Sequence, residues 1–411
     1  MEVQHDPRTG RKMINQYMII RELGRGTHGK VKLAFDTASG EYYAIKVIDK
    51  EPRGRRLRPG PGPLHGRLRI DVDKMEKVKR EIAILKKCRH PNVVRLREVI
   101  DDAHARRIYL VIEYMDGGEI AWRDADHLPL MTTDRARCVF RGLVLGVEYL
   151  HYVGILHRDL KPQNLLCSKA GAVKISDFGV SFLSRKMSKH RLDHAASAGP
   201  ADEERELAKT AGTPAFFAPE LCYDEVDQPL PTTLITPSID IWAMGVTLYC
   251  FIYGRVPFQA TTEFELFNII PRQPLKFPQH LDLAPLDPDL RDLLSRMLDK
   301  DFRTRITIDE IKHHPWVVKD LDHPNSWAKE TDPACRPSLT ITSQEVEHAM
   351  VPKLRQRRGF RATVRHRISM LSPLTSKNQR QQQQQQQQHL HQLRLGTART
   401  KSSLDWLKIW Q

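Results

Sequence analysis

The spacing of apolar residues changes character at Gly117-Gly118, and this change limits the architectures open to the chain. Before it, short β-branched and aromatic runs predict strands, and residues 75–85 place apolar side chains on one helical face. After it, residues 134–151 and 239–253 read as helices, the second nearly all apolar but too short to span a bilayer. The expected strands are residues 17–23, 30–36, 41–49, 93–100 and 108–114. A strand-rich lobe followed by a helical lobe predicts an α+β fold.

The length of 411 residues, with 40% apolar and 28% charged residues, is enough for two lobes that share a cleft. This composition excludes a peptide, a fibre or a small disulfide scaffold. The six cysteines lie far apart without a C-x-x-C pair, so we expect reduced thiols. No apolar run reaches the ~18 residues of a transmembrane segment, and residues 1–12 lack a secretory h-region. We therefore expect a cytoplasmic protein, with the nucleus as a second compartment.

The formal charge of +15 is concentrated in two segments. Residues 51–70 carry a net charge of +5 and residues 333–411 carry +11, which leaves the remainder close to neutral. A fold that binds nucleic acid is basic on the fold itself, so this distribution predicts no specific nucleic-acid partner.

Two parts of the chain have the composition of loops or tails. Residues 52–69 contain six Arg, four Pro and four Gly, which predicts an insertion that neither continues a helix nor buries a core. The ordered pattern fades after Trp316, and a glutamine tract occupies residues 381–388.

A glycine-rich turn between two expected strands is the first candidate for ligand binding. Gly24, Gly26 and Gly29 precede Val31 in a G-x-G-x-x-G-x-V pattern, which lets a backbone close over phosphate oxygens. Alone this pattern is weak, because it opens no helix as a dinucleotide fingerprint does. Lys46 ends the following strand and supplies a positive charge for the α- and β-phosphates of a nucleotide.

Three further motifs follow in order. They are His157-Arg158-Asp159-Leu160-Lys161-Pro162-Gln163-Asn164, Asp177-Phe178-Gly179 and Ala218-Pro219-Glu220. With the glycine-rich turn and Lys46, this ordered set resembles the protein kinase family. The resemblance covers about three quarters of the chain and implies a two-lobed kinase fold with a strand-rich N-lobe and a helical C-lobe. It divides the chain into an N-terminal extension (1–16), a catalytic domain (17–317) and a basic, largely disordered regulatory tail (318–411).

The resemblance assigns roles that suit phosphoryl transfer, in which a protein mainly positions groups and compensates charge. Asp159 accepts the proton of the substrate hydroxyl, and Lys161 screens the charge on the transferred phosphate. Lys161 also resembles the serine/threonine rather than the tyrosine class. Asn164 and Asp177 are oxygen donors suited to Mg²⁺. Lys46 needs an orienting anion, for which Glu81 is the candidate.

The same resemblance predicts where ATP binds. Residues 112–115 resemble the hinge whose backbone reads the adenine edge, with Ile112 at the back of the pocket and Glu119 placed for the ribose. The expected ATP-binding residues are Leu23, Gly24, Arg25, Gly26, Thr27, His28, Gly29, Val31, Ala44, Lys46, Glu81, Glu113, Met115, Glu119 and Leu166.

Other motif residues are expected to be scaffolding. By resemblance, His157 stacks in a hydrophobic spine with Leu85, Leu96 and Phe178 and does not act as a base. Glu220 and Arg305 resemble a buried ion pair of the large lobe. Asp240 resembles its loop-anchoring carboxylate.

Three features are similar to the calcium/calmodulin-dependent protein kinase kinases, especially their fungal members. They are the Arg/Pro-rich insert at 51–70, the sequences of 174–181 and 212–220, and the segment 341–347. The resemblance implies a substrate that is itself a kinase, phosphorylated on its activation-loop threonine. In fungi this substrate is the homologue of the AMP-activated kinase, and a calmodulin-dependent kinase is the other candidate.

The activation segment, residues 177–220, is 44 residues long. Lys209 occupies the position where kinases switched by phosphorylation carry the acceptor, so we expect basal activity without that event. Thr210 is the neighbouring candidate for a regulatory site. Thr213 resembles the threonine that hydrogen-bonds near Asp159, and we expect it to be structural.

Residues 353–371 carry seven Lys or Arg and no acidic residue, with apolar residues at helical spacing. Such a helix can enter the groove of calmodulin or lie on an anionic membrane, whereas the alternative is a solvated tail. The resemblance favours an autoinhibitory, calmodulin-binding segment within 345–371.

Two alternatives remain open from the sequence. A non-catalytic kinase-fold scaffold predicts loss of Lys46, Asp159 or Asp177, and all three are present. Another calmodulin-linked or stress-pathway serine/threonine kinase would share every catalytic motif.

Overall fold

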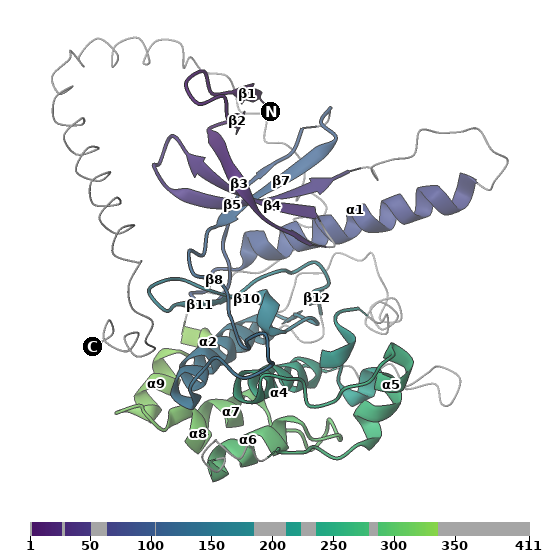
Figure 1. The fold of residues 1–411 in the computed structure, drawn as a ribbon, viewed down its shortest axis with the longest axis vertical. Helices are drawn as coiled ribbons and strands as arrows, with labels where there is room; N and C mark the ends of the chain where they lie inside the picture. The colour runs from purple at the N-terminus through teal and green to yellow at the C-terminus, as the bar shows by residue number, and fades with distance from the viewer. Residues whose placement is uncertain are drawn as a thin grey trace, which may run out of the picture. The chain divides into compact units, whose positions relative to one another are not determined.

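Among the residues described in the computed structural model, seven antiparallel strands form the sheet of the first lobe, in the order β1-β2-β3-β4-β5-β7-β6 (Figure 1). The strands are β1 (Val3–His5), β2 (Lys12–Ile14), β3 (Tyr17–Gly26), β4 (Gly29–Asp36), β5 (Tyr42–Asp49), β6 (Leu96–Ile100) and β7 (Arg107–Glu113). The structure describes residues 2–26, 29–50, 64–102, 104–184, 211–222, 236–278 and 287–335, with side chains described outside residues 26 and 64–74.

The first two strands extend the sheet beyond the expected small lobe. They lie in residues 1–16, where the sequence predicts only an extension. Strand β2 pairs with β3, and Ile14 is 2% exposed beside Tyr17, whose hydroxyl donates a 2.9 Å hydrogen bond to Glu98. Burial, reinforced by the Glu98 carboxylate, raises the pKa of the Tyr17 hydroxyl. These N-terminal residues are therefore part of the sheet.

The sheet buries apolar side chains on both faces, because alternate residues of a strand point to opposite sides. One cluster contains Ile45 and Val47 of β5, and a second contains Ile48 of the same strand. The first cluster is completed by Ile14, Tyr17, Ala34, Tyr43, Ile100, Tyr109 and Val111. The second packs against α1 through Val78 and Ile82.

Helix α1 (Leu64–Lys87) is longer than expected and includes residues 64–70 of the Arg-rich insert. The prediction that this insert cannot be helical is wrong for those residues. The last proline of the insert is Pro63, directly before the helix, and residues 64–70 contain a single glycine and no proline. A proline at a helix start breaks no hydrogen bond, since the first N–H groups are unpaired anyway. Residues 51–63 lie outside the described part of the chain.

Strand β6 begins three residues later than predicted, at Leu96. Val93 instead forms an isolated parallel bridge with Ile175, and the N–H of Val94 donates to the carbonyl of Ile175 at 2.9 Å. The segment before β6 therefore hydrogen-bonds to the second lobe.

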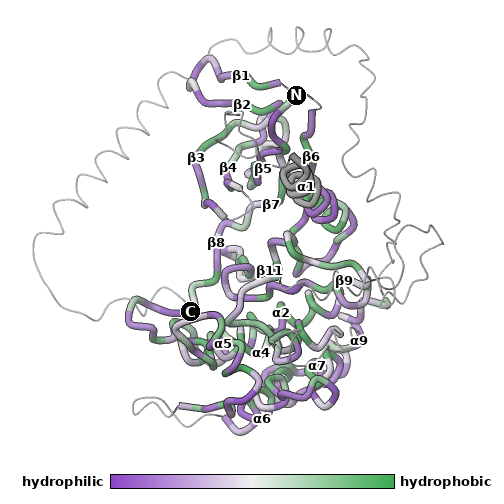
Figure 2. Tube along the Cα trace, turned by 90° about the vertical axis from the view of Figure 1, so that its right-hand side faces the viewer, coloured by the Kyte–Doolittle hydropathy of each residue, from purple (hydrophilic) through white to green (hydrophobic). Residues whose placement is uncertain are grey.

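Helix α4 (Ser238–Tyr253) forms the centre of the second lobe. Fourteen of its 16 residues are buried, which explains why its sequence lacks a polar stripe, and Figure 2 colours it predominantly green. The helix ends at Gly254, which has a φ of 67°. A Cβ at Gly254 would lie 2.2 Å from the carbonyl oxygen of His127, so this close approach requires glycine.

The other helices lie around α4, and the short strands lie between these helices and the sheet of the first lobe (Figure 1). The helices are α2 (Thr133–Tyr152), α5 (Glu263–Arg272), α6 (Pro288–Met297), α7 (Ile308–His313), α8 (Pro315–Val318) and α9 (Pro324–Glu330). The short strands are β8 (Gly118–Glu119), β9 (Ile155–Leu156), β10 (Leu165–Cys167), β11 (Val173–Ile175) and β12 (Phe182–Leu183). Single 3₁₀ turns are η1 (Pro162–Asn164), η2 (Pro214–Phe216), η3 (Pro219–Leu221) and η5 (Pro333–Cys335).

Regular structure continues past Trp316, contrary to the expectation that order fades there. Trp327 of α9 packs against the large-lobe core, and the ammonium of Lys312 lies 5.9 Å from its ring centroid. A single tryptophan can anchor such a short helix because a tryptophan side chain buries a large area. The residues around Trp327 are mostly polar, so the sequence shows no apolar spacing that would predict the helix. Residues 336–411, including 345–371 and the glutamine tract, lie outside the described residues.

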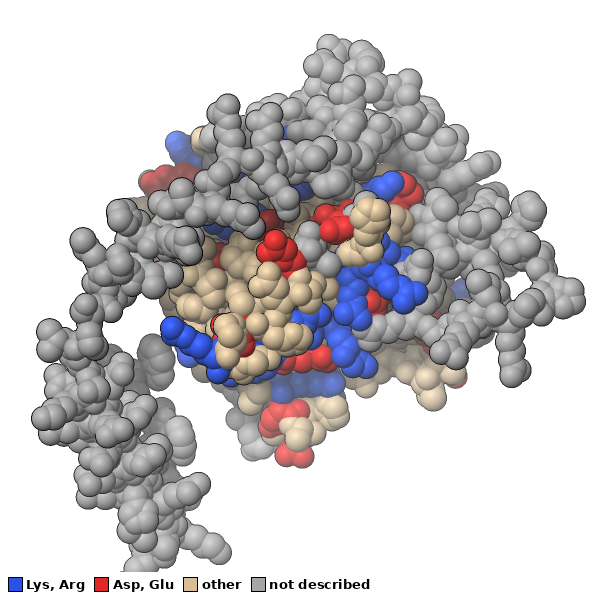
Figure 3. Space-filling model, turned by 90° about the horizontal axis from the view of Figure 1, so that it is seen from above, with Lys and Arg blue, Asp and Glu red and all other residues tan. Residues whose placement is uncertain are grey.

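Basic and acidic side chains are interspersed on the face of the molecule shown in Figure 3. This mixture agrees with the near-neutral charge of the chain outside its two basic segments. None of the six cysteines, all of them in described segments, forms a disulfide. No helix in the described ranges has the length and apolar character needed to cross a membrane.

Candidate active site

Lys46 lies where the sheet, α1 and the segment after β11 meet. Its ammonium is 2.6 Å from Oε1 of Glu81 and 3.0 Å from Oδ1 of Asp177. The Lys46 and Glu81 side chains are 12% and 4% exposed, whereas that of Asp177 is 40% exposed. Burial alone would lower the pKa of Lys46, but the two carboxylates outweigh it and raise that pKa. Lys46 is therefore held as a cation.

Asp159 lies in the loop after β9 at the centre of a second polar cluster. Its Oδ1 accepts a 2.7 Å hydrogen bond from Thr213, and its Oδ2 lies 2.8 Å from the ammonium of Lys161. Lys161 also donates to the Thr213 hydroxyl at 2.7 Å. The expected hydrogen bond between Thr213 and Asp159 is thus present. Two short contacts hold the carboxylate in one orientation, and the Lys161–Thr213 contact fixes the two groups that make them.

Asn164 connects the Asp159 cluster to Asp177. Its amide nitrogen donates to the carbonyl and to Oδ2 of Asp159, at 2.7 and 3.0 Å. Its backbone carbonyl accepts hydrogen bonds of 2.8 and 2.9 Å from the N–H and hydroxyl of Ser176, the residue before Asp177. Because both amide contacts use the nitrogen, the Asn164 side-chain oxygen is the atom left to accept.

Asn164 and Asp177 fit a magnesium ion by donor chemistry. An amide oxygen and a carboxylate are the hard oxygen donors that Mg²⁺ prefers. Among the described residues, no group of three or more His, Cys, Asp or Glu could hold a metal by itself. A Mg²⁺ bound at this pair would need further oxygen ligands beyond these two side chains, of the kind that water and phosphate supply.

Two residues of the site adopt left-handed backbone conformations that are uncommon outside glycine. Asp177 has a φ of 61° and Arg158 has a φ of 68°. Such residues store strain and occur where the surroundings hold them, often at functional sites. At Arg158 the holding group is Asp240, whose carboxylate accepts the N–H groups of His157 and Arg158 at 2.9 Å each.

His151 adds a support that the sequence did not reveal. It donates a 2.9 Å hydrogen bond from Nε2 to Asp240, which is 1% exposed. Burial would raise the pKa of Asp240, but His151 and the backbone N–H of Arg158 overcome this effect and lower it. His151 is 89 residues from Asp240, so no local pattern signals this contact.

The glycine-rich turn joins β3 and β4 above Lys46. Gly24 pairs with Val31, and Val31 pairs with Lys46 on β5. Gly29 has a φ of 143°, and a Cβ there would lie 2.1 Å from the carbonyl oxygen of Val47. At Gly24 a Cβ would meet no atom within 4 Å, so internal packing does not require glycine there.

The remaining members of the expected ATP site lie along the same strands. Leu23 is half-buried, and Arg25 is exposed and lies 3.7 Å from Glu22. Gly26 ends β3 opposite Gly29. Thr27 and His28 lie outside the described residues.

The expected hinge leaves β7 and enters β8. Ala44 pairs with Ile112, and Met115 is 6% exposed. Glu119 of β8 pairs with Leu166 of β10, so these two expected ATP-binding residues are neighbours. The Glu113 side chain instead contacts Lys174, which the sequence marked only as the first residue of the 174–181 resemblance and not as a site residue.

The expected scaffold contacts support these clusters. His157 is fully buried, its ring lies 5.1 Å from that of Phe178, and its Nε2 donates to the Ser176 carbonyl at 3.1 Å. Leu85 belongs to the same core, with Leu96 packed against it. His157 therefore packs in the core and does not face the cleft.

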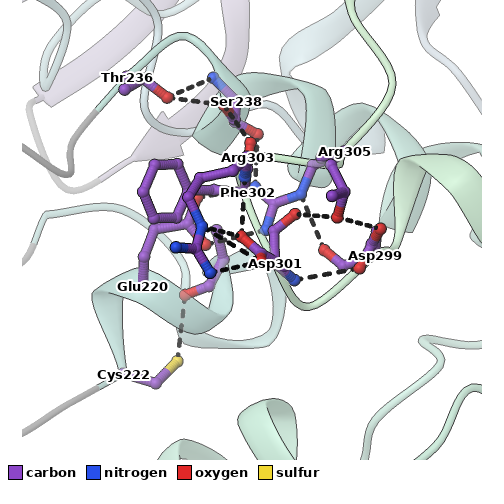
Figure 4. A network of polar contacts seen from close by, with 11 residues as sticks. Glu220, Cys222, Thr236, Ser238, Asp299, Asp301, Phe302, Arg303 and Arg305 are labelled. Atoms are coloured by element: carbon purple, nitrogen blue, oxygen red, sulfur yellow. Dashed lines mark hydrogen bonds and ion pairs between the residues drawn. The ribbon is translucent and has the colours of Figure 1, made fainter.

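Glu220 and Arg305 form the expected buried ion pair, with Nη1–Oε1 and Nη2–Oε2 distances of 2.7 and 2.9 Å (Figure 4). The guanidinium also donates to the carbonyls of Ser238 and Asp299, at 2.9 and 3.0 Å. This network joins the end of the activation segment to α4 and to the loop before α7. Lys209 and Thr210 of the same segment lie outside the described residues.

Comparison with known proteins gives consistent matches. A model of the protein kinase domain matches residues 17–317. Serine/threonine-protein kinase ssp1 of Schizosaccharomyces pombe is 50% identical over 354 residues, covering 85% of this chain and 50% of that protein. SNF1-activating kinase 1 of Saccharomyces cerevisiae is 42% identical, covering 79% and 30%. The calcium/calmodulin-dependent protein kinase kinase of Caenorhabditis elegans is 37% identical, covering 83% and 59%. The chain thus spans 30% to 59% of the length of these relatives.

Proposed function

The chain belongs to the protein kinase family, and from this premise we propose that it transfers the γ-phosphate of Mg-ATP to serine or threonine side chains of a protein. One observation carries the proposal: Lys46 contacts both Glu81 and Asp177, while Asn164 bonds the Asp159 carboxylate and also Ser176, the residue before Asp177. A phosphate-binding cation, an oxygen-donor pair and a proton acceptor are therefore connected around one cleft.

Asp159 acts on the substrate hydroxyl in this proposal. Its carboxylate is oriented by contacts with Thr213, Lys161 and Asn164. The carboxylate is therefore already in the orientation in which it accepts the hydroxyl proton. The ammonium of Lys161 lies 2.8 Å from Oδ2 of Asp159 and would stabilise negative charge on the transferred phosphate. The protein contributes mainly position and charge.

Lys46 and the glycine-rich turn hold the triphosphate. The raised pKa of Lys46 keeps its positive charge for the α- and β-phosphates. The open space at Gly24 leaves the backbone accessible to phosphate oxygens. Asn164 and Asp177 would hold Mg²⁺, which when bound neutralises charge on the β- and γ-phosphate oxygens.

The protein substrate in this proposal is a downstream kinase, phosphorylated on its activation-loop threonine. The names of two relatives support this class: one is an SNF1-activating kinase and the other a calcium/calmodulin-dependent protein kinase kinase. For this chain we favour a kinase of the SNF1 and AMP-activated type over a calmodulin-dependent kinase, because the two fungal relatives are the more similar in sequence.

We assign regulation to the tail, with calmodulin binding within 345–371 and autoinhibition by the same segment. This assignment is supported by the seven basic residues of 353–371 and by the apolar residues at helical spacing among them. Residues 17–317 form the catalytic domain in this proposal, and the strands β1 and β2 before it and helix α9 after it pack on the same fold. We place the activity in the cytoplasm and nucleus, and Thr210 stays a candidate phosphorylation site.

The decisive experiment incubates the purified chain with Mg-ATP and a kinase-dead SNF1-type kinase as substrate. We expect phosphate on the activation-loop threonine of the substrate, identified by mass spectrometry, and none with Asp159→Asn. Nucleotide binding by Asp159→Asn, measured by calorimetry, controls for folding. Transfer that persists in Asp159→Asn would contradict the assignment, and transfer to other sites only would contradict the substrate class.

The regulatory assignment has its own test. The full chain and a chain ending at residue 350 are compared with and without calcium-calmodulin. We expect calmodulin to raise the activity of the full chain, and the shortened chain to be active without it. An unchanged activity and calcium response after truncation would exclude the role of the tail.

A further inference from the structure

The segment that joins the two lobes is held by polar contacts on both sides of Tyr114 and Met115. After them, the backbone N–H of Lys169 donates to the Asp116 side chain at 2.8 Å, and that of Gly117 donates to the Cys167 carbonyl at 3.0 Å. Before them, the anchor is Glu113. Tyr114 and Met115 belong to the 112–115 hinge, whose backbone is expected to read the adenine edge.

Glu113 is held through its side chain by a residue of the other lobe. The ammonium of Lys174 lies 2.9 Å from Oε1 and 3.0 Å from Oε2. Oε1 also accepts a 2.8 Å hydrogen bond from the backbone N–H of Arg95. The side chains are 28% and 17% exposed for Glu113 and Lys174, so water only partly screens the pair.

The segment 92–95 closes these contacts into a ring. On one side, the N–H of Glu113 donates to the Arg95 carbonyl at 3.0 Å. On the other, the Asn92 carbonyl accepts the N–H of Ile175 at 2.9 Å, and the Asn92 amide donates to the Val173 carbonyl. Lys174 lies between those two residues on β11. Segment 92–95, the end of β7 and β11 are therefore mutually bonded, and the Lys174–Glu113 contact is the charged member of the ring.

We propose that Lys174 is a positioning residue for nucleotide selection, which acts through Glu113 to fix the backbone of residues 113–115 against the adenine edge. This inference rests on the proposed ATP site. The physical reason is that a base is distinguished by hydrogen bonds to its edge, whose strength falls steeply as donors and acceptors shift out of line. Loosening one anchor lets the backbone move and weakens the recognition of adenine. The phosphate contacts of Lys46 lie elsewhere and stay intact.

The test measures the dissociation constants of Mg-ATP and Mg-GTP by calorimetry for Lys174→Gln, Lys174→Met and Glu113→Gln. We expect Mg-ATP binding to weaken about five- to tenfold, with a smaller change for Mg-GTP, so that selectivity for adenine falls. Lys174→Arg keeps the charge and is expected to stay within about twofold of wild type. In phosphotransfer assays the same variants raise the KM for ATP with kcat nearly unchanged.

Lys319→Gln is the matched control, because it breaks a 2.7 Å pair with Asp287 at an exposed site. It should leave both dissociation constants unchanged. A double-mutant cycle of Lys174→Gln with Glu113→Gln should show strong non-additivity. Selectivity equal to wild type in all three variants, or additive effects, would overturn the proposal.

Thermal unfolding is recorded for each protein, and Lys174→Met retains the aliphatic stem if Lys174→Gln is unstable. A general loss of stability would weaken ATP and GTP binding alike and would also overturn the proposal. If the wild-type chain binds Mg-ATP selectively but transfers no phosphate, the proposed function fails while the role of Lys174 stands. If it binds no nucleotide, both fail.

Discussion

The hydroxyl of Thr213 donates a 2.7 Å hydrogen bond to Oδ1 of Asp159. Thr213 lies at the end of the activation segment, whereas Asp159 lies 54 residues earlier in the loop after β9. Because Lys161 contacts both side chains, the three groups form a closed triangle. The position of the activation segment is thereby coupled to the orientation of the candidate proton acceptor.

Replacing Thr213 with valine should lower kcat about ten- to hundredfold, because Asp159 loses one orienting donor and Lys161 loses an acceptor. Thermal stability should change little, since the side-chain volume is nearly the same. Thr213→Ser keeps the hydroxyl and should retain most activity. Equal activity of the valine and serine variants would show that the triangle does not matter for transfer.

Glu81→Gln should lower kcat/KM for ATP about ten- to hundredfold, because Lys46 loses its buried charge partner and turns toward Asp177. Glu76→Gln is the control on the same helix. Glu76 is exposed and pairs with Lys79 at 3.0 Å, and its loss should have no effect on kinetics. Comparable losses in both variants would point to a general effect on α1.

Arg305→Met should destabilise the protein by about 3–5 kcal/mol, because it leaves the Glu220 carboxylate buried without its partner. The double variant Glu220→Leu with Arg305→Met should recover part of that loss. Arg296→Met breaks an exposed pair with Glu310 and should cost about 0.5 kcal/mol. Urea unfolding measures all three, and a small effect of Arg305→Met would contradict the structural role of the pair.

Lys300 gives stability an unusual pH dependence. Its ammonium lies 3.7 Å from the centroid of Phe258 and 4.9 Å from that of Trp242, and it donates to the carbonyl of Ile270. Burial lowers the pKa of Lys300 from 10.5 to about 8 in the folded protein. Between these values the unfolded chain binds more protons than the folded one, so this group makes stability rise with pH.

Replacing Lys300 with methionine removes that rise, because the variant has no ammonium to desolvate. The difference in unfolding free energy between variant and wild type should be largest near pH 7, and should shrink as pH increases from about 8 to 10.5. Taking the difference cancels the titration of the tyrosines and of the cysteines other than Cys222, whose pKa Lys300 lowers. Lys319→Met, at an exposed position, should give a difference that varies little between about pH 7 and pH 10, because the carboxylate of its partner Asp287 titrates only at acidic pH.

Ile14→Ala should lower the unfolding free energy by about 2–4 kcal/mol, because it opens a cavity beneath the N-terminal hairpin. Val3→Ala, at a side chain that is 45% exposed in β1, should change stability by only a few tenths of a kcal/mol. Equal stabilities of the two variants in urea unfolding would show that residues 1–16 do not belong to the folded lobe.

The predicted elements were recovered where the pattern is local. Strands β3, β4, β5 and β7 and helices α2 and α4 lie within a few residues of their predicted ranges, because side-chain periodicity reflects which face is buried. The N-terminal hairpin was missed because each of its strands is only three residues long and the side chains of β1 are exposed. The start of α1 was missed because the prediction used the composition of residues 52–69 as a whole. The proline residues lie before residue 64, so the last residues of this segment are compatible with a helix.

The sequence by itself determined the kinds of groups available for chemistry: Lys46, Asp159 and Asp177 in their motifs, and the order of a strand-rich and a helical lobe. Only the tertiary structure decided which groups meet, as with Lys174 and Glu113, or His151 and Asp240. The physical reason is that residue type and periodicity act over a few neighbours. Contacts between residues 61 or 89 positions apart depend on how strands register and helices pack, which no local pattern encodes.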